Sequence, residues 1–243
     1  MNEPDASLAP TSCLEPTLCV SPTYFVDSDD PDLAAYAERV AGDTSDPLEK
    51  ARRLYLAIRD DVRYDPYRLG NEPEDFKASS TLKRRYGFCV TKAALLTAVA
   101  RAQGIPARLG FADVRNHLTS PRLRKAMGTD VFVFHGYTEF YLNDRWVKAT
   151  PAFNKSLCLL ARIVPLEFDG VHDSIYHPFD ADGRQHMEYL EDRGVYLDIP
   201  FDEMVRVFRE TYGEATENWM SGDWKGGRFE EEVETSRTVA PDP

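Results

Sequence analysis

Cys89 is the residue of this sequence best placed to act as a nucleophile. It follows Gly87 and Phe88 and opens an apolar run of helical spacing that stops at Gly104. A cysteine in the first turn of a helix lies at the positive end of the helix dipole, beside unpaired backbone N–H groups. Both features favour the thiolate, and the same N–H groups are suited to bind an oxyanion. The alternative is a buried cysteine that serves as a small apolar side chain.

His135 is the candidate base for this sulfur. It follows the apolar run 131–134, which is typical of a buried strand. An imidazole at the end of such a strand needs a polar partner, and Cys89 would supply one. The alternative is a core histidine without a chemical role.

Two kinds of element must position these residues, and they occupy different parts of the chain. Capping residues and apolar spacing predict helices over 31–41, 47–62, 80–87, 89–103 and 201–212. Runs of β-branched and aromatic residues predict strands over 107–114, 131–142 and 145–150, the last two joined by a hairpin at Asn143-Asp144. Helices followed by a sheet indicate an α+β fold with an antiparallel sheet rather than alternating βαβ units.

The order and composition of the segments predict one domain. We expect a flexible N-terminus over 1–12, a single domain over 13–220 with its core at 45–155, and a disordered acidic tail over 221–243. Further strands and irregular segments are expected over 158–200, where proline and glycine interrupt the pattern.

Four separated motifs resemble those of the transglutaminase-like superfamily of papain-type thiol enzymes. They are G-x-C at a helix start, R-x-x-G-I-P-A-R after that helix, H-x-x-x-E-x-Y on a strand, and W-V followed by a proline turn, at 87–89, 101–108, 135–141 and 146–151. The resemblance covers roughly residues 54–154, and the flanking segments look like those of bacterial stand-alone members. It implies a papain-like fold in which Cys89 is the nucleophile and His135 is the base.

The third position of the family's catalytic triad departs from the pattern. The family has an aspartate four residues after the hairpin tryptophan, and this sequence has Thr150 there. A threonine can accept a hydrogen bond from the imidazole but adds no negative charge. Asn154, the more distant Asp169, or no group at all are the alternatives, and the last would make the site degenerate.

Two further residues of the resembling segment have competing interpretations. Tyr64, at the end of the helix before Cys89, is either an oxyanion donor or a packing aromatic. Glu139 shares the strand face of His135 by its period of two and is expected to pair with Arg108 or Arg101.

Composition limits the class of partner. The 41 acidic and 29 basic residues give a formal charge of −12, which argues against nucleic acid and anionic membranes as partners. Four cysteines without a CxxC pair argue against a disulfide scaffold or structural zinc, and an acidic N-terminus favours a cytoplasmic protein. A metal site is not expected, although histidines and acids cluster at His172, Asp173, His177, His186 and Glu188.

The sequence therefore predicts cysteine-based acyl transfer without a cofactor. The expected substrate is an amide-bearing peptide or protein, attacked by Cys89 to form a thioester, with hydrolysis favoured over crosslinking because water is the default acceptor. The principal alternative is a catalytically degenerate domain that binds a peptide or protein in the same cleft. A metal hydrolase is a third hypothesis, and the oligomeric state is left open.

Overall fold

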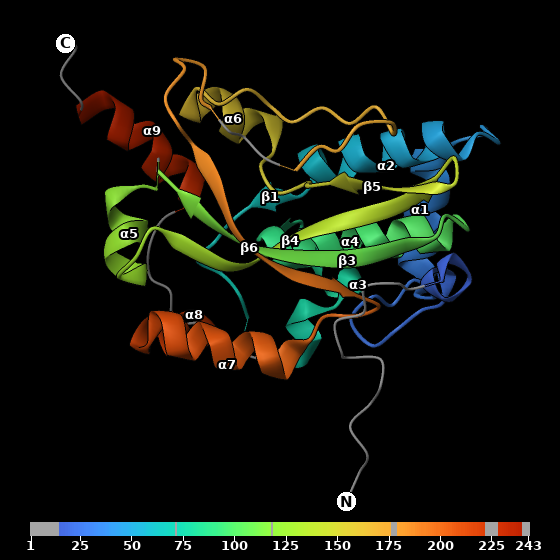
Figure 1. The fold of residues 1–243 in the computed structure, drawn as a ribbon, viewed down its shortest axis with the longest axis horizontal. Coiled ribbons are helices and arrows are strands. Elements are labelled where there is room, and N and C mark those ends of the chain that lie inside the picture. Colours follow the sequence, from blue (N-terminus) through green and yellow to red (C-terminus); the bar gives the residue numbers. More distant parts are fainter. Residues whose placement is uncertain (1–14, 71, 118, 176–178, 222–227, 240–243) are drawn as a thin grey trace, which may run out of the picture.

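A four-stranded antiparallel sheet with the order β5–β4–β3–β6 forms the centre of the computed structural model (Figure 1). The model describes residues 15–70, 72–117, 119–175, 179–221 and 228–239, and only the backbone of 235–239. The strands are β3 (Ala107–Asn116), β4 (Val131–Leu142), β5 (Arg145–Ala149) and β6 (Met187–Tyr196). This confirms the α+β class and its antiparallel sheet, whereas the expected flexible segment 1–12 lies outside the described residues.

The helices of the first half begin where their caps predict. Asp30 accepts the N–H of Leu33 at 3.0 Å and Asp46 accepts that of Leu48 at 3.1 Å, and a proline follows each cap. These helices are α1 (Pro31–Ala41), α2 (Pro47–Asp61), α3 (Ala78–Arg84) and α4 (Cys89–Ala102).

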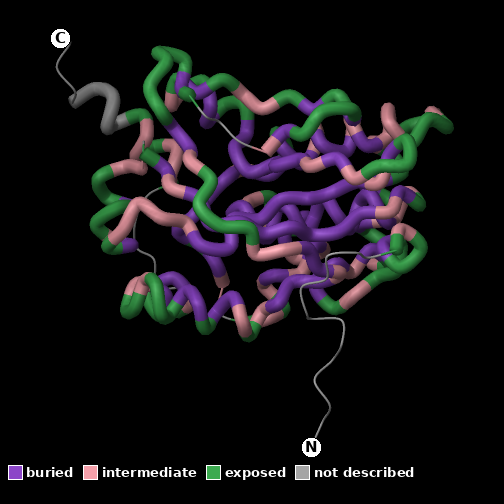
Figure 2. Tube along the Cα trace, viewed as in Figure 1, coloured by how far each residue is buried: buried purple, intermediate pink, exposed green. Residues whose placement is uncertain are grey.

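Helix α4 is the core of the molecule. It packs against α1, α2 and α3 on one side and against β4 and β3 on the other, so nearly all of its side chains are buried (Figure 2). The buried ammonium group of Lys92 donates to the carbonyl of Arg59 at 2.9 Å and also to that of Val62. This contact ties the end of α2 to the first turns of α4, and burial lowers the pKa of Lys92 to about 7.

A short parallel pair connects α2 to the start of α4. Strand β1 (Arg63–Tyr64) pairs with β2 (Tyr86–Gly87), with Tyr64 opposite Gly87. The pairing therefore places Tyr64 beside the segment that leads into Cys89.

The β4–β5 hairpin forms as the sequence predicts. Asn143 and Asp144 have φ of 50° and 60°, and Leu142 pairs with Arg145 across the turn. A two-residue turn with two positive φ angles matches the twist of antiparallel strands, and Asn and Asp tolerate this conformation.

The remaining helices surround the sheet (Figure 1). They are α5 (Pro121–Met127), α6 (Lys155–Ala161), α7 (Phe201–Tyr212), α8 (Glu214–Met220) and α9 (Phe229–Val239), with 3₁₀ turns at Pro16–Val20 and Pro73–Phe76. Only α7 was predicted among these. Within the described part of the chain, none of the helices is both long and apolar enough to cross a membrane.

Helix α9 lies within the expected disordered tail over 221–243, of which 222–227 and 240–243 lie outside the described residues. Phe229 packs edge-on against Tyr64 and Tyr67, with ring centroids 5.8 and 5.9 Å apart. Glu232 accepts a hydrogen bond from the Tyr67 hydroxyl at 2.6 Å, and Glu230 accepts one from the Asn154 amide at 2.9 Å. Local composition indicates disorder, but these tertiary contacts stabilise the helix.

Candidate active site

The turn before Cys89 explains the glycine of the G-x-C motif. A Cβ on Gly87 would lie 2.5 Å from the Thr91 hydroxyl, so no larger residue fits without displacing it. That hydroxyl accepts the N–H of Phe88 at 3.2 Å and thereby caps the helix start. Cys89 is consequently held in the first turn of α4, as predicted.

The His135 segment lies directly against this first turn. A Cβ on Gly136 would be 2.9 Å from the Val90 Cα and 3.3 Å from the Cys89 carbonyl oxygen. Because residue 136 has no side chain, strand β4 approaches the helix end at backbone contact. The structure thus brings together the two segments that carry Cys89 and His135.

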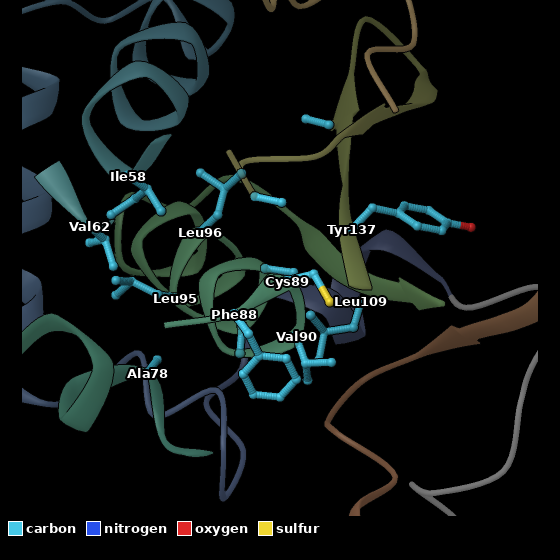
Figure 3. Close-up of a cluster of buried hydrophobic side chains, with 14 of the residues drawn as sticks. Ile58, Val62, Ala78, Phe88, Cys89, Val90, Leu95, Leu96, Leu109 and Tyr137 are labelled. Carbon is cyan, nitrogen blue, oxygen red and sulfur yellow. The ribbon is translucent and has the colours of Figure 1, made fainter. Parts of the chain in front are cut away.

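Cys89 borders a narrow apolar cavity of about 40 Å³. Figure 3 shows it beside Phe88, Val90 and Leu109, whereas Tyr137 of β4 extends away from α4. Residues of α5 and α7 line the same cavity. Its lining comprises Tyr64, Pro66, Leu69, Phe88, Cys89, Leu123, Met127, Phe132, Val133, Phe208 and Tyr212.

Burial decides the protonation state of Cys89. It raises the pKa of the thiol to about 11, although hydrogen bonds with the backbone of Gly136 and Val90 act in the opposite direction. In this conformation, burial therefore opposes the thiolate that the helix start favours. The reason is that desolvation by the apolar neighbours exceeds the effect of the backbone N–H groups.

His135 is buried and neutral. Burial lowers the pKa of its imidazole to about 4, and the residue is 5% exposed. Burial therefore favours the neutral form of both Cys89 and His135. None of the described residues makes a hydrogen bond to the imidazole.

The residues expected to orient His135 have other partners. The Thr150 hydroxyl donates to the Ile175 carbonyl at 3.3 Å, and Asp169 binds His172 at 2.7 Å on the surface. The Asn154 oxygen accepts the Tyr64 N–H at 3.0 Å. Asn154 therefore positions Tyr64, and the structure does not bring any of these three side chains into hydrogen bonding with the imidazole.

Tyr64 lies beside Cys89 and lines its cavity. Burial is the main cause that raises the pKa of its hydroxyl well above the usual value, and a charge on Cys89 would raise it further. Its ring also packs edge-on against Phe153, at 4.8 Å between centroids. The structure therefore supports the packing role and leaves the oxyanion role as a prediction.

Glu139 pairs with Arg108, one of its two predicted partners. The Arg108 Nε donates to a Glu139 carboxylate oxygen at 2.7 Å, and the guanidinium lies 3.9 Å from the Trp146 ring centroid. Arg101 instead donates to backbone carbonyls, including that of Ala107 at 2.9 Å. Glu139, Arg108 and Trp146, which belong to the motifs, therefore have a structural role in this buried cluster.

A second, larger hollow of about 270 Å³ adjoins the Cys89 region. Tyr64 lies between the two, because it lines the smaller cavity and its ring contacts Phe153 and Phe229 of the larger one. The larger hollow is lined by Asn116, Thr119, Ser120, Pro121, Phe153, Leu157, Ala161, Ile163, Arg184, His186, Phe229 and Val233.

The histidine and acid cluster does not converge on one point in the described residues, where no group of three or more such side chains could hold a metal ion. His172 binds Asp169, and Glu188 binds Arg115 and His117, each at 3.2 Å. His177 lies outside the described residues.

Sequence reasoning missed the side chains that shape β4 next to His135. Asp113 accepts the N–H of Phe134 at 3.0 Å, and Tyr212 accepts that of Val133 at 2.8 Å. An acid inside the apolar strand run 107–114 was the one available signal, because a buried carboxylate needs a partner.

Residues 34–151 match the family model of the transglutaminase-like superfamily. This match supports a member of the transglutaminase-like superfamily, whose general chemistry is cysteine-based acyl transfer. No curated protein matches the chain.

Two solved structures are similar to parts of the chain. A "Putative Cysteine Protease" from Cytophaga hutchinsonii is 21% identical, with a TM-score of 0.42 over 73% of this chain and 52% of that one. The periplasmic domain of TgpA from Pseudomonas aeruginosa is 19% identical, with a TM-score of 0.40 over 58% and 48%. This chain spans about half the length of these structures.

Proposed function

We propose that this protein is a thiol hydrolase that cleaves an amide bond of a peptide or protein substrate through a thioester on Cys89. The observation that carries the proposal is the backbone contact between Gly136 and the first turn of α4, which holds the segments of Cys89 and His135 together. The match to the superfamily model supports the same assignment of nucleophile and base.

The protonation states define how the reaction would proceed. A neutral imidazole takes the thiol proton as sulfur bonds to the carbonyl carbon, and then gives it to the leaving amine as the C–N bond breaks. In the second half, His135 takes a proton from water as oxygen bonds to the acyl carbon. The C–S bond then breaks and the proton returns to Cys89.

The oxyanion of each tetrahedral intermediate would be stabilised by the start of α4. Its first N–H groups have no intrahelical partners, and the Tyr64 hydroxyl lines the same cavity. Tyr64 thus keeps its role as a candidate donor.

Hydrolysis is favoured over crosslinking by the lining of the Cys89 cavity. None of the described residues that line it is a carboxylate, so a lysine ammonium group would lose water there without gaining a counter-ion. Water needs no such partner. The neighbouring 270 Å³ hollow has the size and apolar lining to take a large side chain of the substrate.

The test uses a peptide digest of a denatured protein in ¹⁸O-labelled water, analysed by mass spectrometry. Hydrolysis introduces one ¹⁸O per new carboxylate, and this signal should disappear in Cys89→Ser and His135→Gln but persist in Cys158→Ala, a matched change at another buried cysteine. Added methylamine would yield N-methyl amides if amine transfer competes. Labelling that persists in Cys89→Ser would refute the proposal.

A specific observation favours a second candidate, the non-catalytic peptide-binding domain. None of the described side chains orients the His135 ring, as an enzyme of this class requires. This candidate predicts no ¹⁸O incorporation by the wild type and peptide retention that is equal in the wild type and Cys89→Ser. The cytoplasmic location and the absence of nucleic-acid and membrane partners stay predictions.

A further inference from the structure

Strand β4 contains a bulge directly before His135. Ala112 pairs with His135 and Val114 pairs with Phe132, so Val133 and Phe134 together face the single residue Asp113. Two residues opposite one define a β-bulge, which bends a strand and redirects its side chains.

Phe134 has a left-handed backbone, with φ of 54°. The other non-glycine residues with positive φ in the described chain lie at the hairpin turn or at helix ends, where this conformation is usual. A bulky residue with positive φ inside a strand is strained by about 1–3 kcal/mol and persists only when its surroundings enforce it.

Side chains from two other elements enforce the bulge. The carboxylate of Asp113 accepts the Phe134 N–H at 3.0 Å, and the Tyr212 hydroxyl of α7 accepts the Val133 N–H at 2.8 Å. The same hydroxyl donates to the Val131 carbonyl at 3.3 Å. Two successive N–H groups of β4 are thus bound by side chains rather than by a neighbouring strand.

Arg193 of β6 fixes the carboxylate in turn. Its guanidinium makes a two-point contact with Asp113, with Nη2 at 2.6 Å from Oδ2, and its centre lies 4.6 Å from the Phe134 ring centroid. Asp113 is 6% exposed. A bidentate pair with a buried carboxylate resists rotation of that carboxylate.

The bulge places Phe132 on the same face of the sheet as His135. Ala112 and Val114 are two residues apart on β3, so their partners His135 and Phe132 share a face although they are three residues apart on β4. Phe132 lines the cavity beside Cys89. Without the extra residue, His135 and Phe132 would lie on opposite faces.

We infer that Asp113, held by Arg193, and Tyr212 are positioning residues that fix the His135 imidazole relative to the cavity that Cys89 borders, because they hold the bulge directly before it. This inference rests on the proposed function, because it assigns the network a purpose in the reaction of Cys89. Asp113 is not among the residues that line the Cys89 cavity, whereas Tyr212 is one of them. Both act through the backbone of Val133 and Phe134.

The first measurement does not depend on activity. In protein labelled at histidine, the His135 ring resonances, assigned by their loss in His135→Gln, should shift in Asp113→Ala and Tyr212→Phe. The matched control is Glu139→Gln, which alters another buried carboxylate–arginine pair of β3 and β4 and should leave these resonances in place. Asp113→Asn keeps an oxygen for the Phe134 N–H and should restore most of the wild-type spectrum.

The second measurement is turnover of a peptide that the wild type hydrolyses. Asp113→Ala and Tyr212→Phe should lower kcat by about 10²-fold with little change in KM, since misplacing a catalytic group by about 1 Å has an effect of this size. If the wild type does not hydrolyse peptides, the proposed function fails and the ring resonances alone decide the inference.

Unchanged His135 resonances in folded Tyr212→Phe, which removes one hydroxyl and keeps the ring, would overturn the inference even if Asp113→Ala does not fold. An equal loss of kcat in Glu139→Gln would also overturn it. That result would show a general effect of stability rather than positioning.

Discussion

The two halves of β4 border the same helix but are stabilised in different ways. From Thr138 to Leu142 the strand pairs with β3 on one side and β5 on the other, and its Glu139 forms a buried ion pair with Arg108. From Val131 to Gly136 it pairs with β3 alone, contains the bulge, and has an apolar cavity beside it. The chemistry-bearing residue, His135, lies in the second half.

The residues of β4 that stabilise the fold and the residue expected to take part in the reaction thus lie in different halves of the strand. Where a strand is paired regularly on both sides, the alternation along the strand fixes the direction of each side chain. At an open edge with a bulge, contacts from other elements can change that direction. The regular half should therefore govern unfolding, and the irregular half should govern the environment of Cys89 and His135. Three experiments test this division, in order of decreasing effect.

Glu139→Ala should produce the largest change. It leaves the Arg108 guanidinium buried without its carboxylate, and breaking a buried pair in this way lowers the free energy of unfolding by about 3–5 kcal/mol. Urea unfolding measures the loss. The control is Glu210→Ala, which removes the exposed Arg206–Glu210 pair and should change stability by less than about 1 kcal/mol. A shift of the His135 resonances in folded Glu139→Ala would contradict the separation of the two halves.

The acid dependence of stability should report on the irregular half. Burial lowers the pKa of His135 to about 4, below the value of about 6.5 in an unfolded chain. As the pH falls from 6.5 to 4, the unfolded chain takes up a proton that the folded protein does not, so stability falls in this window.

His135→Gln should remove this contribution, which amounts to about 3 kcal/mol. The pKa of His186 is also lowered to about 4, but His186 is present in both proteins and cancels in the difference. Urea unfolding at pH 7, 6, 5 and 4 measures the two slopes. Parallel curves for the two proteins would mean that the imidazole is solvated and that the irregular half is open.

The smallest effect concerns α9, which packs on Tyr64 beside the irregular half. Glu232→Gln weakens its hydrogen bonds with Tyr67 and Ser120 and should lower stability by about 0.5–1.5 kcal/mol. Hydrogen exchange of the α9 amides should accelerate in the same variant. Glu234→Gln, at an exposed position of the same helix, should change neither quantity, and an equal effect there would indicate a role of net charge.

The predictable parts of this molecule are those set by local chemistry. Asp30-Pro31 and Asp46-Pro47 define helix starts within a few residues, and Asn143-Asp144 defines a turn, so these elements were confirmed. Helix α9 was not predictable, because Phe229 needs the rings of Tyr64 and Tyr67 from a distant segment. Short helices such as α6 likewise depend on tertiary contacts.

The candidate site divides in the same way. The motifs predicted that Cys89 begins a helix and that a strand carries His135, and the resemblance placed the two segments together. The effect of burial on the Cys89 pKa was not predictable, because the residues that line its cavity come from distant segments such as α5 and α7. The bulge depends on Asp113 and Arg193, which are 80 positions apart in the chain.

The backbone contact at Gly136 has a consequence for how this site tolerates change. A single methyl group there would meet the Val90 Cα at 2.9 Å, in the first turn of a helix whose residues are almost all buried. Both α4 and β4 are packed in the core, so even an alanine at position 136 would push the two elements apart. In a saturation library scored for folded protein, position 136 should therefore accept fewer substitutions than Cys89 itself, although it contributes no functional group.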